Sequence, residues 1–333
     1  MSYTPPFTIT SKTLNLVAEI SESVGRLSET KEASQALHLR RVNRIRTIQG
    51  SLAIEGNTLS EAQITAVLEG KRVMAPPKEV QEVKNALAAY DAFERWKAHR
   101  EKDLLEAHQR LMLGLVDELG VYRSGGVGVM NGSEVIHMAS PANQVPRLMA
   151  DLLDWVQQAE YHPLIISSVF HYEFEFIHPF VDGNGRMGRL WQSLILAEWH
   201  ELFANLPVEN LVYRQQAEYY TALSQSTAQA DSAPFIEFML SMISQALKEQ
   251  INTPQATPQA TPQAVLDIIN KYPDLTQYAT KPRSRQELQL FCGLNDREHF
   301  RKTVLKPLLL HGWLLLTLPD KPKSPKQRYV YKG

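Results

Sequence analysis

Apolar residues recur at spacings of three and four along residues 1–250, as in Val42, Ile45, Ile48 and Leu52. The same spacing returns in residues 190–195. It places the apolar side chains on one face of an α-helix, which can bury that face against neighbouring helices. The pattern predicts an all-α, mainly helical region.

Residues 127–138 interrupt the helical pattern. The runs VGVM and SEVIHM flank the pair Asn131-Gly132, which readily adopts the positive φ angles of a type I′ turn. The segment therefore predicts a short β-hairpin. Since an isolated hairpin is marginally stable in water, we expect it to lie on the helical body with one strand edge free.

A short repeat divides the chain. Residues 253–264 read TPQATPQATPQA, and the prolines disfavour helix and sheet, so we expect a semi-rigid linker over 251–264. Regions 1–110 and 111–250 precede it, and a tail, 265–333, follows. The tail contains 13 Lys and Arg against 6 Asp and Glu, a net charge of +7, which leaves −8 for the rest of a chain whose net charge is −1.

Composition narrows the class of protein. The 333 residues suffice for about two domains, and a charged fraction of 21% is typical of a soluble globular enzyme. The one cysteine, Cys292, excludes a disulfide framework and a multi-cysteine metal site. The N-terminus has no apolar core, and no later stretch reaches the ~20 apolar residues of a membrane-spanning helix. We therefore expect a cytoplasmic protein without membrane contact.

The segment with candidate chemistry is residues 178–185, His-Pro-Phe-Val-Asp-Gly-Asn-Gly, between helical patterns at Tyr161–Ile177 and Arg186–Trp199. Its glycines allow close approach of a ligand, and the N-terminus of the next helix offers unpaired N–H groups and partial positive charge. An anion fits there. Arg186 and Arg189, three residues apart, add two cations that suit the phosphates of one chain.

Two further side chains of this segment suit phosphate chemistry. Asp182, beside the basic residues, can hold Mg²⁺, which prefers carboxylate and phosphate oxygens. His178 can accept a proton near neutral pH and is the candidate general base.

The run His178-x-Phe180-x-Asp182-Gly183-Asn184-Gly185-Arg186-x-x-Arg189 resembles the complete signature of the Fic family (filamentation induced by cAMP). Members of this family mostly transfer AMP from ATP to protein hydroxyl groups. The similarity extends over roughly Ile54 to Leu247. It implies a mainly helical Fic fold whose catalytic core lies in 111–250, with a flap at 127–141 and the motif at 178–189.

The resemblance implies a role for each motif position. His178 would be the general base for the target hydroxyl, and Asp182 would bind Mg²⁺. Gly183, Asn184 and Gly185 would form an anion hole for the α- and β-phosphates. The rest of the nucleotide site would be Arg186, Met187, Gly188 and Arg189. Such roles suit in-line phosphoryl chemistry, where positioning and charge neutralisation supply most of the rate.

Residues 51–57, Ser-Leu-Ala-Ile-Glu-Gly-Asn, end a predicted helix that Gly56 can close, and Thr58-x-x-Glu61 predicts a capping box for the next helix. Glu55 thus lies at a helix C-terminus, where a carboxylate is disfavoured unless a cation is near. The segment resembles the inhibitory motif of Fic proteins, built here on Ser51, Glu55 and Gly56. In that motif the glutamate pairs with the last arginine, here Arg189, and ATP binds only in an unproductive pose.

The predicted hairpin resembles the family's flap, whose free edge would present a Ser, Thr or Tyr hydroxyl of an extended target to the active site. Val135, Ile136 and His137 are the expected flap contacts at the nucleotide site. Downstream, Tyr219-Tyr220 resembles a helix that bears an adenine-contacting tyrosine, with Tyr220 the better match. A pair of tyrosines on a helix also suits core packing.

The tail predicts helix, turn and helix over 284–312, then strands Trp313–Leu318 and Gln327–Tyr331, and resembles a small α+β winged-helix domain. Basic residues gather on its second helix and its wing: Arg297, Arg301, Lys302, Lys321, Lys323, Lys326 and Arg328. This face could contact nucleic acid phosphates. Winged helices also bind proteins, and basic faces are often only solvated.

The sequence thus predicts a protein adenylyltransferase that uses ATP and Mg²⁺, modifies target proteins and is restrained by Glu55. The resemblance also suggests a homodimer and modification of the chain itself. One alternative is a DNA-binding regulator that senses ATP and contacts DNA through 265–333. Another is a Fic enzyme that transfers a different nucleotide or phosphate-linked group, or removes AMP. Fold-level analogy does not separate these.

Overall fold

The computed structural model of the chain describes residues 3–28, 33–126, 128–131, 134–252, 263–294, 296–310, 313–317, 324 and 327–331. The chain divides into two compact units, Met1–Asn252 and Thr253–Gly333. Helices dominate, and the described strands form two separate two-stranded sheets. The prediction of a mainly helical fold with a small hairpin is confirmed.

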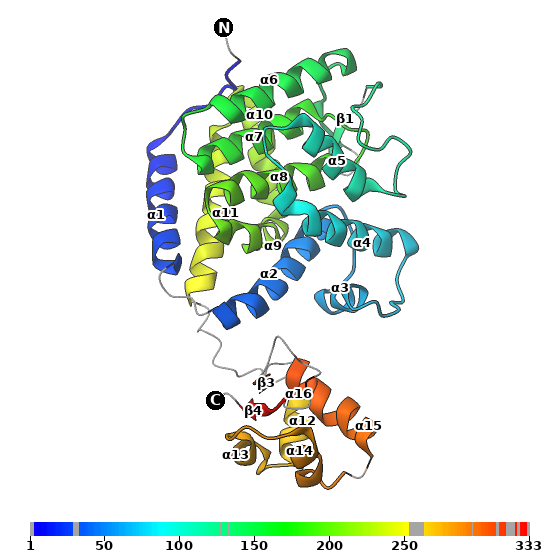
Figure 1. The fold of residues 1–333 in the computed structure, drawn as a ribbon. Helices are drawn as coiled ribbons and strands as arrows, with labels where there is room; N and C mark the ends of the chain where they lie inside the picture. Colours follow the sequence, from blue (N-terminus) through cyan, green and yellow to red (C-terminus); the bar gives the residue numbers. More distant parts are fainter. Residues whose placement is uncertain are drawn as a thin grey trace. The chain divides into compact units, whose positions relative to one another are not determined.

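The N-terminal unit contains eleven described α-helices and one hairpin (Figure 1). In chain order the helices are α1 (Ser11–Ser28), α2 (Ala33–Ile54), α3 (Glu61–Leu68), α4 (Pro77–Ala92), α5 (Glu101–Met112), α6 (Val145–Gln158), α7 (Pro163–Ile177), α8 (Asn184–Trp199), α9 (Val208–Arg214), α10 (Gln216–Gln229) and α11 (Ala233–Asn252). Short 3₁₀ turns lie at Phe93–Arg95, Ala142–Gln144 and Glu201–Asn205.

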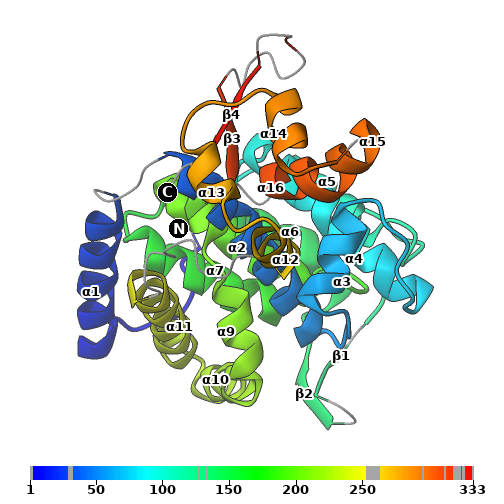
Figure 2. The ribbon, with the colours of Figure 1, turned by 90° about the horizontal axis from the view of Figure 1, so that it is seen from below.

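Helices α7 and α8 form the centre of this unit. They pack against each other, and α5, α6 and α11 lie against them (Figure 1). Nearly every residue of α7 is buried, and the buried residues include serine, histidine and glutamate as well as apolar side chains. On the outside, α1 runs along α11, and α2 packs on α9 (Figure 2). The loop between α7 and α8 is therefore held at both ends by the two central helices of the unit.

The predicted hairpin is present as strands β1 (Gly128–Asn131) and β2 (Glu134–Met138), and it projects from the helical body (Figure 2). Asn131 pairs with Glu134, so it is a strand residue, and its prediction as a turn residue is wrong; Gly132 lies outside the described residues. The register skips Ile136, since Val135 pairs with Met130 and the next residue in register is His137. Such a bulge bends and twists the strand.

Three predicted boundaries differ from the structure. The helix after the inhibitory segment begins at Glu61, and its capping box is Ser60 with Gln63; Thr58 instead bonds the Glu79 carboxylate. The motif helix begins at Asn184, two residues early, because Gly183 adopts the positive φ that starts it. Helices reach Asn252 and begin again at Gln263, so the two ends of the predicted linker are helical, and residues 253–262 lie outside the described residues.

The C-terminal unit has its own core, centred on Leu288, Phe300, Leu314 and Tyr329. Its elements are α12 (Gln263–Lys271), α13 (Leu275–Ala279), α14 (Arg285–Phe291), α15 (Arg297–Phe300), a π-helical turn (Arg301–Leu305), α16 (Lys306–Leu310), β3 (Leu314–Leu316) and β4 (Tyr329–Tyr331). The order of helix, turn, helix and two strands is the predicted one.

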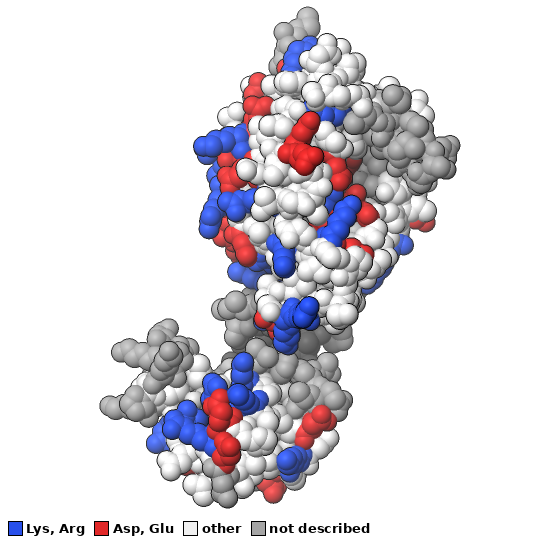
Figure 3. Space-filling model, turned by 90° about the vertical axis from the view of Figure 1, so that its right-hand side faces the viewer, with Lys and Arg blue, Asp and Glu red and all other residues white. Residues whose placement is uncertain are grey.

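Acidic partners accompany several basic residues of this unit. Glu298 pairs with both Arg301 and Lys302, and Glu287 pairs with Arg328. Figure 3 shows basic and acidic side chains side by side on the face in view. Lys321, Lys323 and Lys326 lie outside the described residues. These pairs reduce the free positive charge available for a nucleic acid, and DNA contact stays a prediction.

Within the described residues, no helix has the length and apolar character needed to cross a lipid bilayer.

Candidate active site

His178 lies at the C-terminal end of α7 in the left-handed backbone region, with φ 54° and ψ 63°. Residues other than glycine are uncommon in this conformation, although Asn, Asp and His adopt it more often than the others, and it costs about 1–3 kcal/mol. The turn lets the chain leave the buried helix at once, while the His178 N–H still donates to Phe174 O at 2.9 Å. The candidate base is therefore fixed at a helix end by backbone geometry.

Gly183 starts α8 with φ +84°. A Cβ there would also lie 2.5 Å from the sulfur of Met112, so both conformation and space require glycine. The Asn184 side chain is buried and bonds Phe180 twice, accepting from its N–H at 2.9 Å and donating to its carbonyl at 2.8 Å. Asn184 thus holds the loop closed with its side chain, and only its backbone remains for the predicted anion hole.

Asp182 and Arg186 face each other across the first turn of α8, with Oδ1 and Nη2 3.3 Å apart. The Asp182 side chain is 47% exposed, whereas that of Arg186 is only 5% exposed. The Nε and Nη1 of Arg186 are buried and have no hydrogen-bond partner among the described residues. Glu82 lies 3.5 Å from Nη1 and accepts a hydrogen bond from Asn57, which ends the predicted inhibitory segment.

Arg189 is paired with Glu55 as the sequence suggested. Its Nη2 lies 2.7 Å from Glu55 Oε1, and its guanidinium also donates to the hydroxyl and the carbonyl of Ser51. The Arg189 side chain is 2% exposed. Burial lowers the pKa of an arginine, but Glu55 outweighs this effect and raises the Arg189 pKa overall. Arg189 therefore keeps its charge although it is buried.

The Glu55 carboxylate also lies over the start of α8. A Cβ placed on Gly185 would meet both this carboxylate and the Arg189 guanidinium. Gly56, with φ +90°, closes α2, and the N–H of Asn57 bonds back to Leu52 O as in a Schellman motif. The backbone of Glu55 thus lies at the C-terminus of α2, where a negative charge is unfavourable. Its carboxylate lies at the N-terminus of α8, where a negative charge is favourable.

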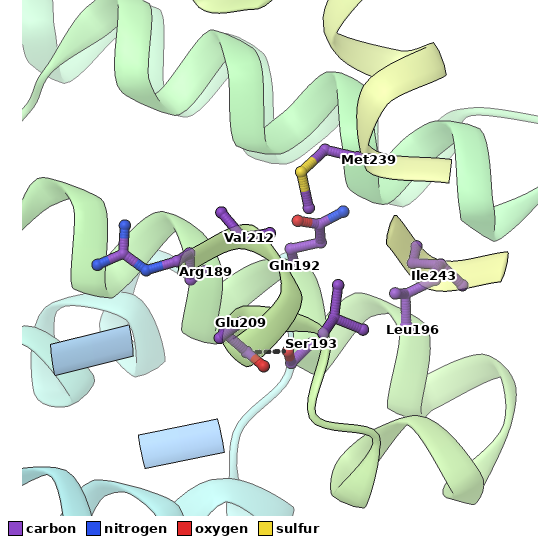
Figure 4. Close-up of a pocket in the computed structure, with 9 residues that line it drawn as sticks. Arg189, Gln192, Ser193, Leu196, Glu209, Val212, Met239 and Ile243 are labelled. Carbon is purple, nitrogen blue, oxygen red and sulfur yellow. Dashed lines mark hydrogen bonds between the residues drawn. The ribbon is translucent and has the colours of Figure 1, made fainter. Parts of the chain in front are cut away.

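Three titratable side chains that interact with Arg189 are buried: Glu175, Glu209 and His171. Burial raises the pKa of Glu175 and of Glu209 to about 7, and it lowers that of His171 to about 3. Glu175 lies between two histidines, 3.8 Å from His171 Nε2 and 3.9 Å from His178 Nδ1. Figure 4 shows Arg189 extending away from Glu209, which accepts a hydrogen bond from Ser193.

Two motif positions serve packing. The Met187 side chain is fully buried in the core. Gly188 faces α7, and a Cβ on it would lie 2.9 Å from the His171 ring and 3.1 Å from Glu175. If Met187 and Gly188 contact the nucleotide as predicted, they can do so only through their backbone atoms.

The flap and the tyrosine pair are the remaining parts of the predicted nucleotide site. Strand β2 passes beside α10, and Val135, Ile136 and His137 are all in β2; their side chains lie outside the described residues. Tyr219 is buried and bonds His171, whereas Tyr220 is half-buried. Gln216 bonds the carbonyl of Ile54, next to Glu55, and lies 3.5 Å from the Tyr220 hydroxyl.

Sequence reasoning missed two residues that support the loop. His108 on α5 stacks on Phe180 at 3.7 Å, accepts from Gly120 N–H and bonds Asp182 O. Its position on the apolar face of α5, four residues from Leu104, was a signal that it is buried. Arg123 donates to four backbone carbonyls around the loop, including His178 O. No local pattern marks it, because three of its four carbonyl partners are 17 to 55 positions away in sequence.

Comparisons with known proteins agree with this geometry. A model of the Fic/DOC family matches residues 98–196, and a model of the Fic-like C-terminal domain (filamentation induced by cAMP) matches residues 275–331. A Fic family protein from Desulfovibrio desulfuricans G20 is 50% identical, with 99% of both chains covered and a TM-score of 0.75.

Curated relatives are more distant. A protein adenylyltransferase from Caenorhabditis briggsae is 30% identical over 259 residues, which is 73% of this chain and 47% of the relative. Another from Caenorhabditis elegans is 33% identical over 216 residues, 60% of this chain and 40% of the relative. The chain thus spans about half the length of the curated relatives it matches. The full-length match to the Desulfovibrio protein and the two family models, together with the loop geometry, show that this chain belongs to the Fic family.

Proposed function

We propose that this chain transfers AMP from ATP to a hydroxyl group of a protein, and that Glu55 restrains the transfer. The observation that carries the proposal is the Glu55–Arg189 pair at 2.7 Å, which puts a carboxylate at the N-terminus of α8. Negative charge is favourable at this position. A phosphate group of ATP would be favoured there for the same reason.

The chemistry needs a base, an anion site and an aligned nucleophile. The target oxygen would attack the α-phosphorus, the bond from that phosphorus to the bridging oxygen would break, and diphosphate would leave. The hydroxyl proton would pass to His178. Arg186 and Arg189 are buried, which strengthens their interaction with a phosphate, and electrostatic stabilisation of the transition state requires such fixed charges.

The two arginines would bind the phosphates differently. The Nε and Nη1 atoms of Arg186 have no hydrogen-bond partner among the described residues, so they can donate to a phosphate without breaking a hydrogen bond. Arg189 is held by Glu55 and Ser51, so its use by ATP requires that Glu55 leaves. ATP can therefore engage one arginine before the other.

Asp182 fits a magnesium ion. Its carboxylate is about half exposed and lies beside the proposed phosphate site. The described residues contain no cluster of three acidic, histidine or cysteine side chains arranged to hold a metal ion by themselves. Mg²⁺ at a phosphate site needs only one or two carboxylates, together with phosphate oxygens and waters. A bound ion would neutralise charge on the nucleotide; the protein's part is to orient Asp182, which accepts from Gly183 N–H at 2.6 Å.

The test is intact-protein mass spectrometry of Glu55→Gly with ATP and Mg²⁺, alone and in lysate. We expect a mass gain of one AMP on the chain or on lysate proteins, with diphosphate released. His178→Asn in the same background should show no gain. Glu69→Gly is the matched control, because Glu69 also pairs with an arginine, Arg41. A Glu55→Gly protein that binds ATP but yields neither AMP-protein nor diphosphate would refute the proposal.

A further inference from the structure

Arg123 lies in the segment between α5 and β1, and it is 2% exposed. Its guanidinium donates four hydrogen bonds, all to backbone carbonyls. Nε donates to His178 O at 2.6 Å, and Nη2 donates to Ile177 O at 3.2 Å. Nη1 donates to Gly125 O at 2.8 Å, and Nη2 also donates to Ser140 O at 2.5 Å. The Arg123 N–H bonds Pro179 O at 2.9 Å.

Among the described residues no carboxylate forms an ion pair with Arg123, and burial lowers its pKa. A buried cation without a counter-charge is costly, so the carbonyl groups must compensate. Ile177 and His178 are the last residue and the C-cap of α7, where unpaired carbonyls and the helix dipole are negative. Arg123 therefore completes the end of α7 at the point where His178 takes its left-handed conformation.

The other two acceptors flank the hairpin. Gly125 precedes β1 (Gly128–Asn131), and Ser140 follows β2 (Glu134–Met138). One planar group thus joins both ends of the flap to the backbone of the candidate base. The guanidinium directs its donors along fixed lines, whereas a lysine ammonium is a compact charge on a flexible stem. Lysine would keep the charge but could not hold four carbonyls in one plane.

We propose that Arg123 is a positioning residue, which sets the distance and orientation between a target segment on the flap and the imidazole of His178. The inference rests on the proposed function, because it assumes that the flap holds the acceptor. Transfer to a protein requires the hydroxyl in line with the phosphorus, and a displacement of about 1 Å can lower such a rate about 100-fold. Transfer to water needs no target segment bound on the flap.

The experiment compares Arg123→Lys and Arg123→Gln with the control Arg110→Lys, all in the full chain carrying Glu55→Gly. Arg110 is a surface arginine of α5 that pairs with Glu106. Two products are measured from the same ATP: AMP bound to protein in lysate, and free AMP with diphosphate. We expect the ratio of protein-bound to free AMP to fall about 30- to 100-fold in both Arg123 variants and to be unchanged in Arg110→Lys. An unchanged ratio in a folded Arg123 variant would overturn the inference.

Amide hydrogen exchange gives a second readout that does not depend on activity. In Arg123→Lys, exchange should accelerate at least about tenfold in peptides containing Gly125, Ser140 and His178 together, and remain as in the parent elsewhere. Acceleration at the flap or at the His178 loop alone would contradict the joint role. If the Glu55→Gly parent consumes no ATP, the proposed function fails, while the exchange result still decides whether Arg123 couples the two segments.

Discussion

Arg189 donates two hydrogen bonds to Ser51, from Nε to the hydroxyl at 3.1 Å and from Nη2 to the carbonyl at 3.0 Å. Ser51 lies one helical turn before Glu55 on α2, so both residues hold the same guanidinium. The arginine that ATP would need is therefore bound by side-chain and backbone atoms of one helix end.

This relationship predicts that Ser51→Ala partly releases the restraint. The variant loses the hydroxyl acceptor but keeps the carbonyl and Glu55. One such hydrogen bond contributes about 0.5–1.5 kcal/mol, so the rate of AMP transfer should rise about 2- to 10-fold, less than in Glu55→Gly. The rate is measured with labelled ATP. Ser23→Ala is the control, since that hydroxyl bonds within its own helix to Glu19 O; equal rates in the two variants would count against the role of Ser51.

The close contact at Gly50 predicts that the packing of α2 on α9 affects the restraint of AMP transfer by Glu55. A Cβ at this position would lie 2.5 Å from the backbone nitrogen of Asn210, so Gly50→Ala should push α2 away from α9. Overpacking of this kind costs about 1–3 kcal/mol, and the displaced helix carries Glu55. We expect lower stability to denaturant together with a higher rate of AMP transfer.

The control for Gly50 is another helical glycine. A Cβ on Gly25 of α1 would have no atom within 4 Å, so Gly25→Ala should raise stability by about 1 kcal/mol through helix propensity and leave the rate unchanged. Loss of stability in Gly50→Ala without any gain in rate would show that the α2–α9 contact does not control Glu55.

His178→Asn separates catalysis from structure. Asparagine tolerates the left-handed conformation better than alanine, so the variant should unfold at nearly the same denaturant concentration as the parent. Loss of a general base lowers rates by about 10²- to 10⁴-fold. Calorimetry should show ATP affinity within about threefold of the Glu55→Gly parent. A parallel loss of ATP affinity would instead make His178 a structural residue.

Asp182→Asn tests the magnesium site. The amide oxygen can still accept from Gly183 N–H, so the turn is kept while the charge is lost. A single charge interaction at 4 Å is worth about 1–4 kcal/mol near a protein surface, so half-maximal transfer should need at least about fivefold more Mg²⁺. EDTA should stop transfer by the parent. An unchanged Mg²⁺ requirement would place the ion elsewhere.

His108 predicts a pH-dependent stability. Burial lowers the pKa of His108 from 6.5 to about 4. Between pH 6.5 and pH 4 the unfolded state therefore binds a proton at His108, whereas the folded state does not. Stability from this residue is complete above pH 6.5 and is lost toward pH 4, at ~1.4 kcal/mol per pH unit.

The matched measurement is urea unfolding of the parent and His108→Asn at pH 7 and pH 5. The parent should be the more stable at pH 7, and its advantage should shrink by about 2 kcal/mol at pH 5. The other buried histidines are common to both proteins and cancel in the difference. A constant advantage would mean that His108 titrates normally.

Local sequence determined the parts of the site that depend on neighbours along the chain. Gly56 closing α2 and the spacing of Arg186 and Arg189 on one helix follow from backbone preference and helical periodicity. The start of α8 does not, because the helix begins at Asn184, two residues before the predicted start. The same preferences predicted the hairpin but assigned Asn131 to its turn, whereas Asn131 pairs with Glu134 as a strand residue, because pairing register also depends on contacts across the strands.

Packing of distant segments determined the rest. Glu55 and Arg189 are 134 positions apart and meet only because α2 and α8 pack in one core. The stacking of His108 on Phe180 and the carbonyls of Ser140, Ile177 and His178 around Arg123 likewise join residues far apart in sequence. Periodicity fixes which face of a helix is buried, but the residues opposite that face depend on how all the helices pack together.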